Sequence, residues 1–197
     1  PLVYYRDNAA DSQITIDDVI KAKINDYKIV LLNGTALNIE PTRSATFFAA
    51  EVADKNDIDV VLDLDFRADQ WHDYRAFGLT IRALLSKVKI AIGTEEEILA
   101  ATMSSTSQVT IKDQQISAPE IKGDIDSSIQ QLLALGIETL IVKKGSAGAS
   151  IHYPDGSKKD VPGFPVESLF PRTGDYFCGA VFGLSQVELR ARRHTYF

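Results

Sequence analysis

The residues that point most directly to chemistry lie in the stretch 170–184, FPRTGDYFCGAVFGL. An irregular turn runs there into a predicted helix, with Gly174-Asp175 at the junction and apolar residues at three- and four-residue spacing behind it. Free N–H groups and a partial positive charge at a helix start suit an anion, and a carboxylate on the same turn can accept the proton of an attacking hydroxyl. Phosphoryl transfer to an alcohol needs both groups. Asp175 can equally be a plain helix cap, since Asp is a favoured capping residue.

A second polar turn, DLDFR at 63–67, follows the apolar run 60–62. One interpretation is the aspartyl-phosphate motif of haloacid-dehalogenase-type phosphatases, in which Asp63 would be a nucleophile. That motif needs Thr or Val two residues beyond the second Asp, where this chain has Arg67. Arg67 can instead bind two phosphate oxygens with its planar guanidinium, or form a structural salt bridge to Asp63 or Asp65.

Two further turns carry charged or glycine-rich sequences. Residues 95–97 are three consecutive glutamates, which are either solvated in the first turn of a helix or include one side chain that holds magnesium, directly or through water. Residues 143–148, KKGSAG, form either a plain hairpin turn or a loop against a nucleotide. The three histidines are far apart in the sequence and lack ligand spacing, so we assign them no metal or nucleophilic role.

Short apolar runs of strand length alternate along the chain with helical patterns. Strands are predicted at 2–5, 29–32, 60–62, 89–92, 139–142 and 149–153, and helices at 16–24, 41–55, 73–88, 95–99 and 129–135. This alternation predicts an α/β fold of three layers, with a doubly wound, mostly parallel sheet covered on both faces. Ligands of such sheets bind at the carboxyl ends of the strands, where all four polar turns are expected.

We expect a single domain over 1–197, with a Ser-, Thr- and Gln-rich mobile insertion at 103–124 and an atypical basic tail at 188–197. The net charge of −6 comes without a block of like charge, which argues against a nucleic-acid or membrane surface. One cysteine, Cys178, excludes an internal disulfide. No apolar run approaches the length of a membrane span, so a cytoplasmic location is expected.

Taken in order, these turns resemble the motifs of the ribokinase (PfkB) family of carbohydrate kinases. DLDFRADQW at 63–71 is similar to the family's Asp-x-Asn-x-Arg…Trp segment, with Asp65 at the Asn position, and GTEEE at 93–97 is similar to its Asn-x-x-Glu motif. KKGSAG at 143–148 is similar to the nucleotide-side loop, and RTGD at 172–175 to the Gly-Ala-Gly-Asp signature. Several stretches of the sequence are most similar to the sugar-acid kinase branch of the family, which acts in inositol breakdown.

The resemblance implies a ribokinase-like fold and ATP- and Mg²⁺-dependent phosphorylation of a sugar or sugar-acid hydroxyl. It implies that Asp175 is the catalytic base, while backbone N–H groups of Thr173 and Gly174 stabilise the transferred phosphoryl group. Glu97 would organise magnesium and Arg67 would contact phosphate. The implied nucleotide-binding residues are Thr94, Lys143, Gly145, Ser146, Gly148 and Gly174.

The sequence also departs from the family pattern, because Arg172 and Thr173 replace the glycine and alanine of the anion-binding turn. Glycine permits backbone conformations and a close phosphate approach that a side chain hinders. We also expect the family's N-terminal sugar-binding and lid strands, and its adenine-side C-terminal elements, to be missing. The alternative is therefore a truncated or degenerate homologue, a weak nucleotide binder or interaction module without catalysis. The oligomeric state is open, with a homodimer as one option.

Overall fold

The computed structural model describes residues 8–110 and 120–163. The predicted strand at 2–5 and the whole turn and helix at 170–184, with Asp175, lie outside these residues. The described α-helices are α1 (Ile16–Lys21), α2 (Thr42–Lys55), α3 (Tyr74–Leu85), α4 (Glu95–Thr102) and α5 (Ile125–Leu133). The described strands are β1 (Ile29–Asn33), β2 (Asp59–Asp63), β3 (Ile90–Thr94), β4 (Val109–Thr110), β5 (Glu120–Ile121), β6 (Thr139–Lys143), β7 (Ala149–His152) and β8 (Lys158–Val161).

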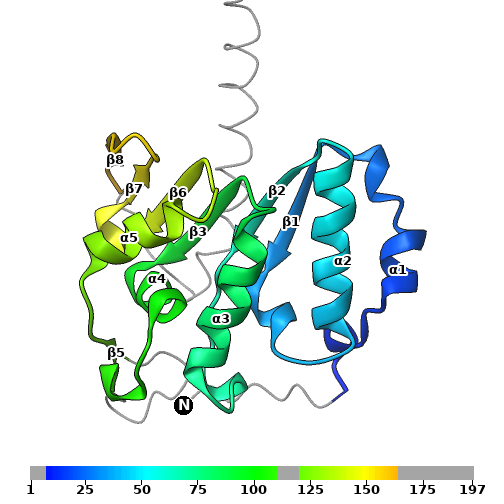
Figure 1. The fold of residues 1–197 in the computed structure, drawn as a ribbon, viewed down its shortest axis with the longest axis horizontal. Helices are drawn as coiled ribbons and strands as arrows, with labels where there is room; N and C mark the ends of the chain where they lie inside the picture. Colours follow the sequence, from blue (N-terminus) through cyan, green and yellow to red (C-terminus); the bar gives the residue numbers. More distant parts are fainter. Residues whose placement is uncertain (1–7, 111–119, 164–197) are drawn as a thin grey trace, which may run out of the picture. The chain divides into compact units, whose positions relative to one another are not determined.

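Six of these strands form one sheet in the order β1-β2-β3-β6-β7-β8. The first four are parallel, and β7 and β8 continue the sheet as antiparallel strands. The predicted mostly parallel α/β sheet is thereby confirmed. Because each crossover from β1 to β6 moves in the same direction and is right-handed, α2, α3 and α4 lie against one face of the sheet, as Figure 1 shows.

The core between this face and the helices is built by alternation along the strands. Leu32, Leu62, Ala91 and Leu140 occupy one row across four strands and point into the buried cluster. Helix α3 supplies Phe77, Ile81, Leu84 and Leu85, whose spacing in the sequence predicts one helical face, and all four are fully buried. The strand residues one step further along therefore lie on the opposite face.

The helix predicted at 16–24 is present as α1, which ends at Lys21, and a capping box between Thr15 and Asp18 starts it. The spacing of Ile16, Val19, Ile20 and Ile24 predicts one buried apolar face, and this prediction is only half right. Val19 and Ile24 pack against the core, but Ile16 and Ile20 are exposed. The helix has six residues and its main packing partner is α2, and within the described part of the chain Ile16 and Ile20 stay uncovered.

The predicted insertion at 103–124 carries some structure at its ends. Residues Val109–Thr110 and Glu120–Ile121 pair as the short antiparallel strands β4 and β5, which form a second, two-stranded sheet. Ile121 is buried in the main core. Among the described residues, no helix is both long enough and apolar enough to cross a membrane.

Candidate active site

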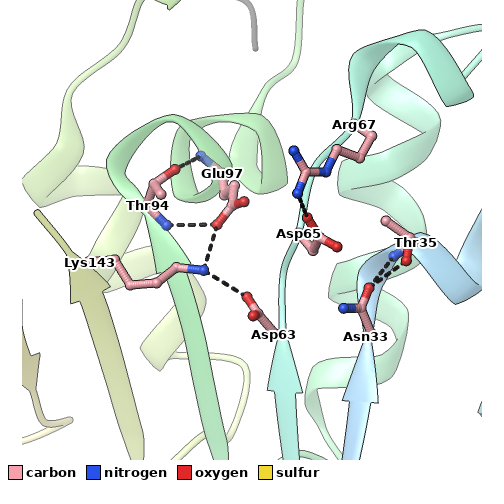
Figure 2. A network of polar contacts seen from close by, with 8 residues as sticks. All are labelled: Asn33, Thr35, Asp63, Asp65, Arg67, Thr94, Glu97 and Lys143. Atoms are coloured by element: carbon pink, nitrogen blue, oxygen red, sulfur yellow. Dashed lines mark hydrogen bonds and ion pairs between the residues drawn. The ribbon is translucent and has the colours of Figure 1, made fainter. Parts of the chain in front are cut away.

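The carboxyl ends of the four parallel strands carry polar side chains. Asn33, Asp63, Thr94 and Lys143 are the last residues of β1, β2, β3 and β6. The register pairs Asn33 with Asp63 and Thr94 with Lys143, so these ends meet at one edge of the sheet. Figure 2 shows that Arg67 and Glu97, from the turns that follow β2 and β3, lie at the same edge. Of the four polar turns predicted to meet at this edge, those at 63–67, 93–97 and 143–148 are found there, and the turn at 170–175 lies outside the described residues.

The turn after β3 fixes the Glu97 carboxylate against the backbone. Thr94 Oγ1 accepts a hydrogen bond from Glu97 N at 3.2 Å, and Glu97 Oε2 accepts one from Thr94 N at 2.7 Å. This reciprocal capping box starts helix α4 and turns Glu97 inward, where 13% of its side chain is exposed. Glu95 and Glu96 are exposed. Of the three glutamates, Glu97 is thus the one held at the strand edge.

Lys143 reaches across the end of β3 to two carboxylates. Its Nζ donates a hydrogen bond to Asp63 Oδ1 at 3.0 Å and lies 3.5 Å from Glu97 Oε2. Side chains of all three residues are about as buried as one another, with 15%, 14% and 13% exposed for Lys143, Asp63 and Glu97. Lys143 was predicted only as a nucleotide contact, and Asp63 only as a phosphatase nucleophile or a partner of Arg67. Their pairing depends on the strand order, which the sequence does not give.

The charge of Glu97 is sensitive to this environment. Burial raises the pKa of the Glu97 carboxyl above its ordinary value, and the nearby carboxylates of Asp63 and Asp65 add to the increase. The Lys143 ammonium and the Thr94 N–H act in the opposite direction, because both favour the ionised form. Lys143 and the Thr94 N–H therefore offset part of the cost of ionising this buried carboxyl.

The turn after β2 positions Arg67 through an ion pair and a buried aromatic ring. Arg67 Nη2 lies 2.8 Å from Asp65 Oδ1, so the predicted salt bridge is formed with Asp65, while Asp63 pairs with Lys143. Asp65 has a φ of 35°, in the left-handed region that few non-glycine residues adopt. Phe66, which lies between Asp65 and Arg67 in the sequence, is buried and packs on Phe77 with ring centroids 4.6 Å apart. The Arg67 side chain is 43% exposed, which leaves it able to meet a phosphate.

The predicted nucleotide loop is a tight turn between β6 and β7. Lys144 N donates to Gly148 O at 2.8 Å, and Gly145–Ala147 form a single 3₁₀ turn. Gly145 and Gly148 have φ values of 56° and 94°, and a Cβ on Gly148 would lie 2.1 Å from the Val161 carbonyl oxygen. Glycine is thus required at 148, whereas at 145 the positive φ only favours it, since a Cβ there would meet no atom within 4 Å. Gly145 and Ser146 are exposed, so the turn geometry fits the plain hairpin interpretation and leaves a surface for a nucleotide.

The remaining predicted site residues, Thr173, Gly174 and Asp175, lie outside the described residues. Within the described part, no group of three or more His, Cys, Asp or Glu side chains could hold a metal ion. A single inward carboxylate such as Glu97 nevertheless fits magnesium that arrives on a nucleotide, because such an ion keeps several waters and needs only one or two carboxylates.

Comparison with known proteins identifies the family. The model of the pfkB family carbohydrate kinases matches residues 2–182. This chain belongs to that family. Family membership favours a kinase over the aspartyl-phosphate phosphatase that the two aspartates of 63–65 also suggested.

Relatives of this PfkB-family chain include 5-dehydro-2-deoxygluconokinases. The one from Photobacterium profundum is 30% identical over 181 residues, which cover 91% of this chain and 51% of the relative. The one from Clostridium botulinum is 25% identical over 168 residues, covering 85% and 46%. The chain therefore spans about half the length of these curated relatives.

Solved structures of similar fold include two kinases with bound nucleotide. A protein assigned as ribokinase II from E. coli, in complex with ATP and Mg²⁺, aligns with a TM-score of 0.71 at 22% identity and covers 91% of this chain and 52% of its own. A double-mutant fructokinase from Vibrio cholerae O395, with fructose, ADP and potassium, aligns with a TM-score of 0.68 at 21% identity, covering 88% and 49%. At these identities the likeness establishes a ribokinase-like fold.

Proposed function

We propose that this chain takes part in the Mg²⁺- and ATP-dependent phosphorylation of a hydroxyl on a sugar or sugar acid. The observation that carries the proposal is the meeting of Glu97, Lys143 and Arg67 at the carboxyl ends of β2, β3 and β6. An inward carboxylate and two cations at one strand edge suit a magnesium-bound phosphate chain, and membership of the PfkB family supports the same chemistry.

The roles follow from the chemistry of each group. Glu97 would bind the nucleotide-borne magnesium, directly or through water, and Arg67 would leave Asp65 to contact a phosphate. Thr94 would hold Glu97 in place, and the exposed turn with Gly145, Ser146 and Gly148 would contact the nucleotide. In the motif at 172–175, Asp175 would remove the proton of the acceptor hydroxyl, and the N–H groups of Thr173 and Gly174 would stabilise the transferred phosphoryl group.

We propose a sugar acid like 5-dehydro-2-deoxygluconate as the acceptor, because the curated relatives carry that name. Their identities of 25% and 30% support a sugar kinase more strongly than one particular substrate. An ATP-dependent sugar kinase also fits a cytoplasmic location. The homodimer stays a prediction.

The experiment is an ADP-release assay on the purified chain with a panel of sugars and sugar acids, including 5-dehydro-2-deoxygluconate. We expect Asp175→Asn to abolish turnover while nucleotide binding survives, because only the proton acceptor is removed. If Asp175→Asn lost binding and turnover equally, Asp175 would be a structural cap. If the folded wild type bound nucleotide but turned over no acceptor, the degenerate-homologue alternative would replace the kinase proposal.

A further inference from the structure

The turn at 145–148 packs closely against the chain that follows it through the β7–β8 hairpin. The antiparallel register pairs Ala149, the first residue after the turn, with Val161, the last residue of β8. We call residues 161–163 the flanking segment, because the chain there runs beside the turn. A Cβ on Gly148 would lie 2.1 Å from the carbonyl oxygen of Val161, so the two segments meet through their backbones.

Gly163 makes the same kind of contact from the other side. A Cβ on Gly163 would lie 2.1 Å from the carbonyl oxygen of Ser146 and 3.0 Å from the backbone nitrogen of Gly148. Unlike Gly148, Gly163 does not have a positive φ, so its backbone conformation does not itself favour glycine. The lack of a side chain at 163 therefore matters for the space that it leaves to the turn.

Hydrogen bonds within the turn close it but do not fix its position relative to the sheet. Ala147 N donates to the carbonyl oxygen of Lys144 at 3.1 Å. Gly148 N donates to the carbonyl oxygen of Gly145 at 3.0 Å. Residues 145–147 are exposed, so packing in the core does not hold them. The backbone contact with the flanking segment therefore limits how far the turn can move.

A side chain at 163 would have to push the two segments apart. A contact of 2.1 Å must open by about 1 Å or more to reach an ordinary van der Waals distance. Because the obstructing atom is a backbone carbonyl oxygen, no side-chain rotation can relieve the overlap. Misplacing a binding group by about 1 Å can weaken its effect by up to about 100-fold.

We propose that Gly163 is a positioning residue, which fixes the 145–148 turn and with it the surface that contacts the nucleotide. The inference rests on the proposed function for its ligand, and on the backbone contacts of Gly148 and Gly163 for its geometry. Gly163 acts through Ser146 and Gly148, without contact to the nucleotide.

The first test is a calorimetric titration of a non-hydrolysable ATP analogue with Mg²⁺ into the folded chain. Gly163→Ala should weaken binding by about 10-fold or more, because the Ser146 carbonyl has to move. Unchanged affinity in a folded Gly163→Ala variant would overturn the proposal, because the flanking segment would then have moved while the turn kept its position.

A matched control lies in the turn at the other end of the same hairpin. Gly156 has a φ of 82°, and a Cβ there would meet no atom within 4 Å. Gly156→Ala therefore strains the hairpin backbone without pushing two segments apart. We expect it to leave affinity for the ATP analogue unchanged. A loss equal to that of Gly163→Ala would overturn the proposal, because any disturbance of the hairpin would then have the same effect.

A second variant loosens the flanking segment without adding an atom. Pro162 is exposed, and its ring fixes the backbone of the flanking segment. Pro162→Gly should weaken binding of the ATP analogue by about threefold, because the flanking segment gains freedom and holds the turn less firmly. If Gly163→Ala did not fold, Pro162→Gly would carry the test, and unchanged affinity in it would overturn the proposal.

The last test needs no ligand, so it separates this proposal from the proposed function. Trypsin cleavage of the Lys144–Gly145 bond, identified by mass, reports opening of the turn. Gly163→Ala should be cleaved there about 10-fold faster than the wild type, and Gly156→Ala at the wild-type rate. Equal rates in the wild type and Gly163→Ala would contradict the proposal. If the wild type bound no ATP analogue, the proposed function would fail and this cleavage alone would judge Gly163.

Discussion

The turns after β2 and β3 both end a parallel strand with charged residues, but they are built in different ways. After β3, the polar groups themselves make the structure, because Thr94 and Glu97 hold each other through the backbone. After β2, the structure comes from the aromatic side chain of Phe66, and Arg67 is held by one ion pair at the surface. The comparison teaches that the Glu97 carboxylate, which we propose as the magnesium ligand, is fixed by backbone hydrogen bonds, whereas the Arg67 guanidinium, which we propose as a phosphate contact, is held only by a partly exposed ion pair.

The largest effect on stability should come from removing the aromatic packing beneath the turn after β2. Phe77 is fully buried and its ring packs against both Phe66 and Trp71, with centroids 4.6 and 5.5 Å apart. Phe77→Ala should lower the free energy of unfolding by about 3–5 kcal/mol, because it leaves a cavity under the turn. Urea denaturation measures this. Leu79→Ala, on the same helix but 65% exposed, is the control and should change stability by less than about 0.5 kcal/mol.

The second effect should be specific to the β3 turn and depend on pH. Because the pKa of Glu97 is raised in the folded state, its contribution to stability is fully present below the ordinary Glu pKa and is lost as pH rises through the raised value. Glu97→Gln does not ionise, so its stability relative to the wild type should increase between pH 4 and pH 8. Denaturation across this range checks it, with the exposed Glu96→Gln as control. A difference that stayed constant with pH would contradict the burial of Glu97.

A smaller loss should follow from opening the capping box. Thr94→Ala removes the hydroxyl that accepts the Glu97 N–H and should cost about 1 kcal/mol of unfolding free energy. Thr94→Ser keeps an acceptor and should recover most of that loss. If Thr94→Ala and Thr94→Ser were equally stable, the box would not be what holds the β3 turn.

The smallest effect should come from the surface ion pair of the β2 turn. Arg67 is 43% exposed, and exposed ion pairs contribute about 0–1 kcal/mol, so Arg67→Ala should leave the free energy of unfolding nearly unchanged. The same variant should weaken binding of ATP, since we propose that the Arg67 guanidinium contacts a phosphate. A stability loss as large as that of Phe77→Ala would show that Arg67 is structural and would erase the contrast between the two turns.

Local patterns in the sequence were enough for most of the fold. The alternation of strands with amphipathic helices predicted β1, β2, β3, β6 and β7 and the buried face of α3. The spacing of Thr94 and Glu97 also matches the capping box, a signal that could have singled out Glu97 among the three glutamates. The Lys143–Asp63 pair was out of reach, because it joins residues 80 positions apart through the strand order β2-β3-β6.

The spacing of apolar residues also did not predict which of them are exposed. Ile16 and Ile20 have the spacing of a buried face, yet 40% and 59% of these residues are exposed. The partner of Arg67 was also not predictable, because the sequence does not distinguish an ion pair to Asp65 from one to Asp63. Both depend on which elements lie next to one another, and periodicity within one element carries no such information.

The most direct test of the central claim is a calorimetric titration of ATP into the 197-residue chain, with and without Mg²⁺, for the wild type and Glu97→Gln. If Glu97 is the fixed carboxylate for nucleotide-borne magnesium, the wild type should bind Mg²⁺-ATP in the micromolar to millimolar range. Glu97→Gln should lose about 10-fold or more of that affinity while binding metal-free ATP as the wild type does. Equal binding of Mg²⁺-ATP by both proteins, or no binding by a folded wild type, would contradict the account.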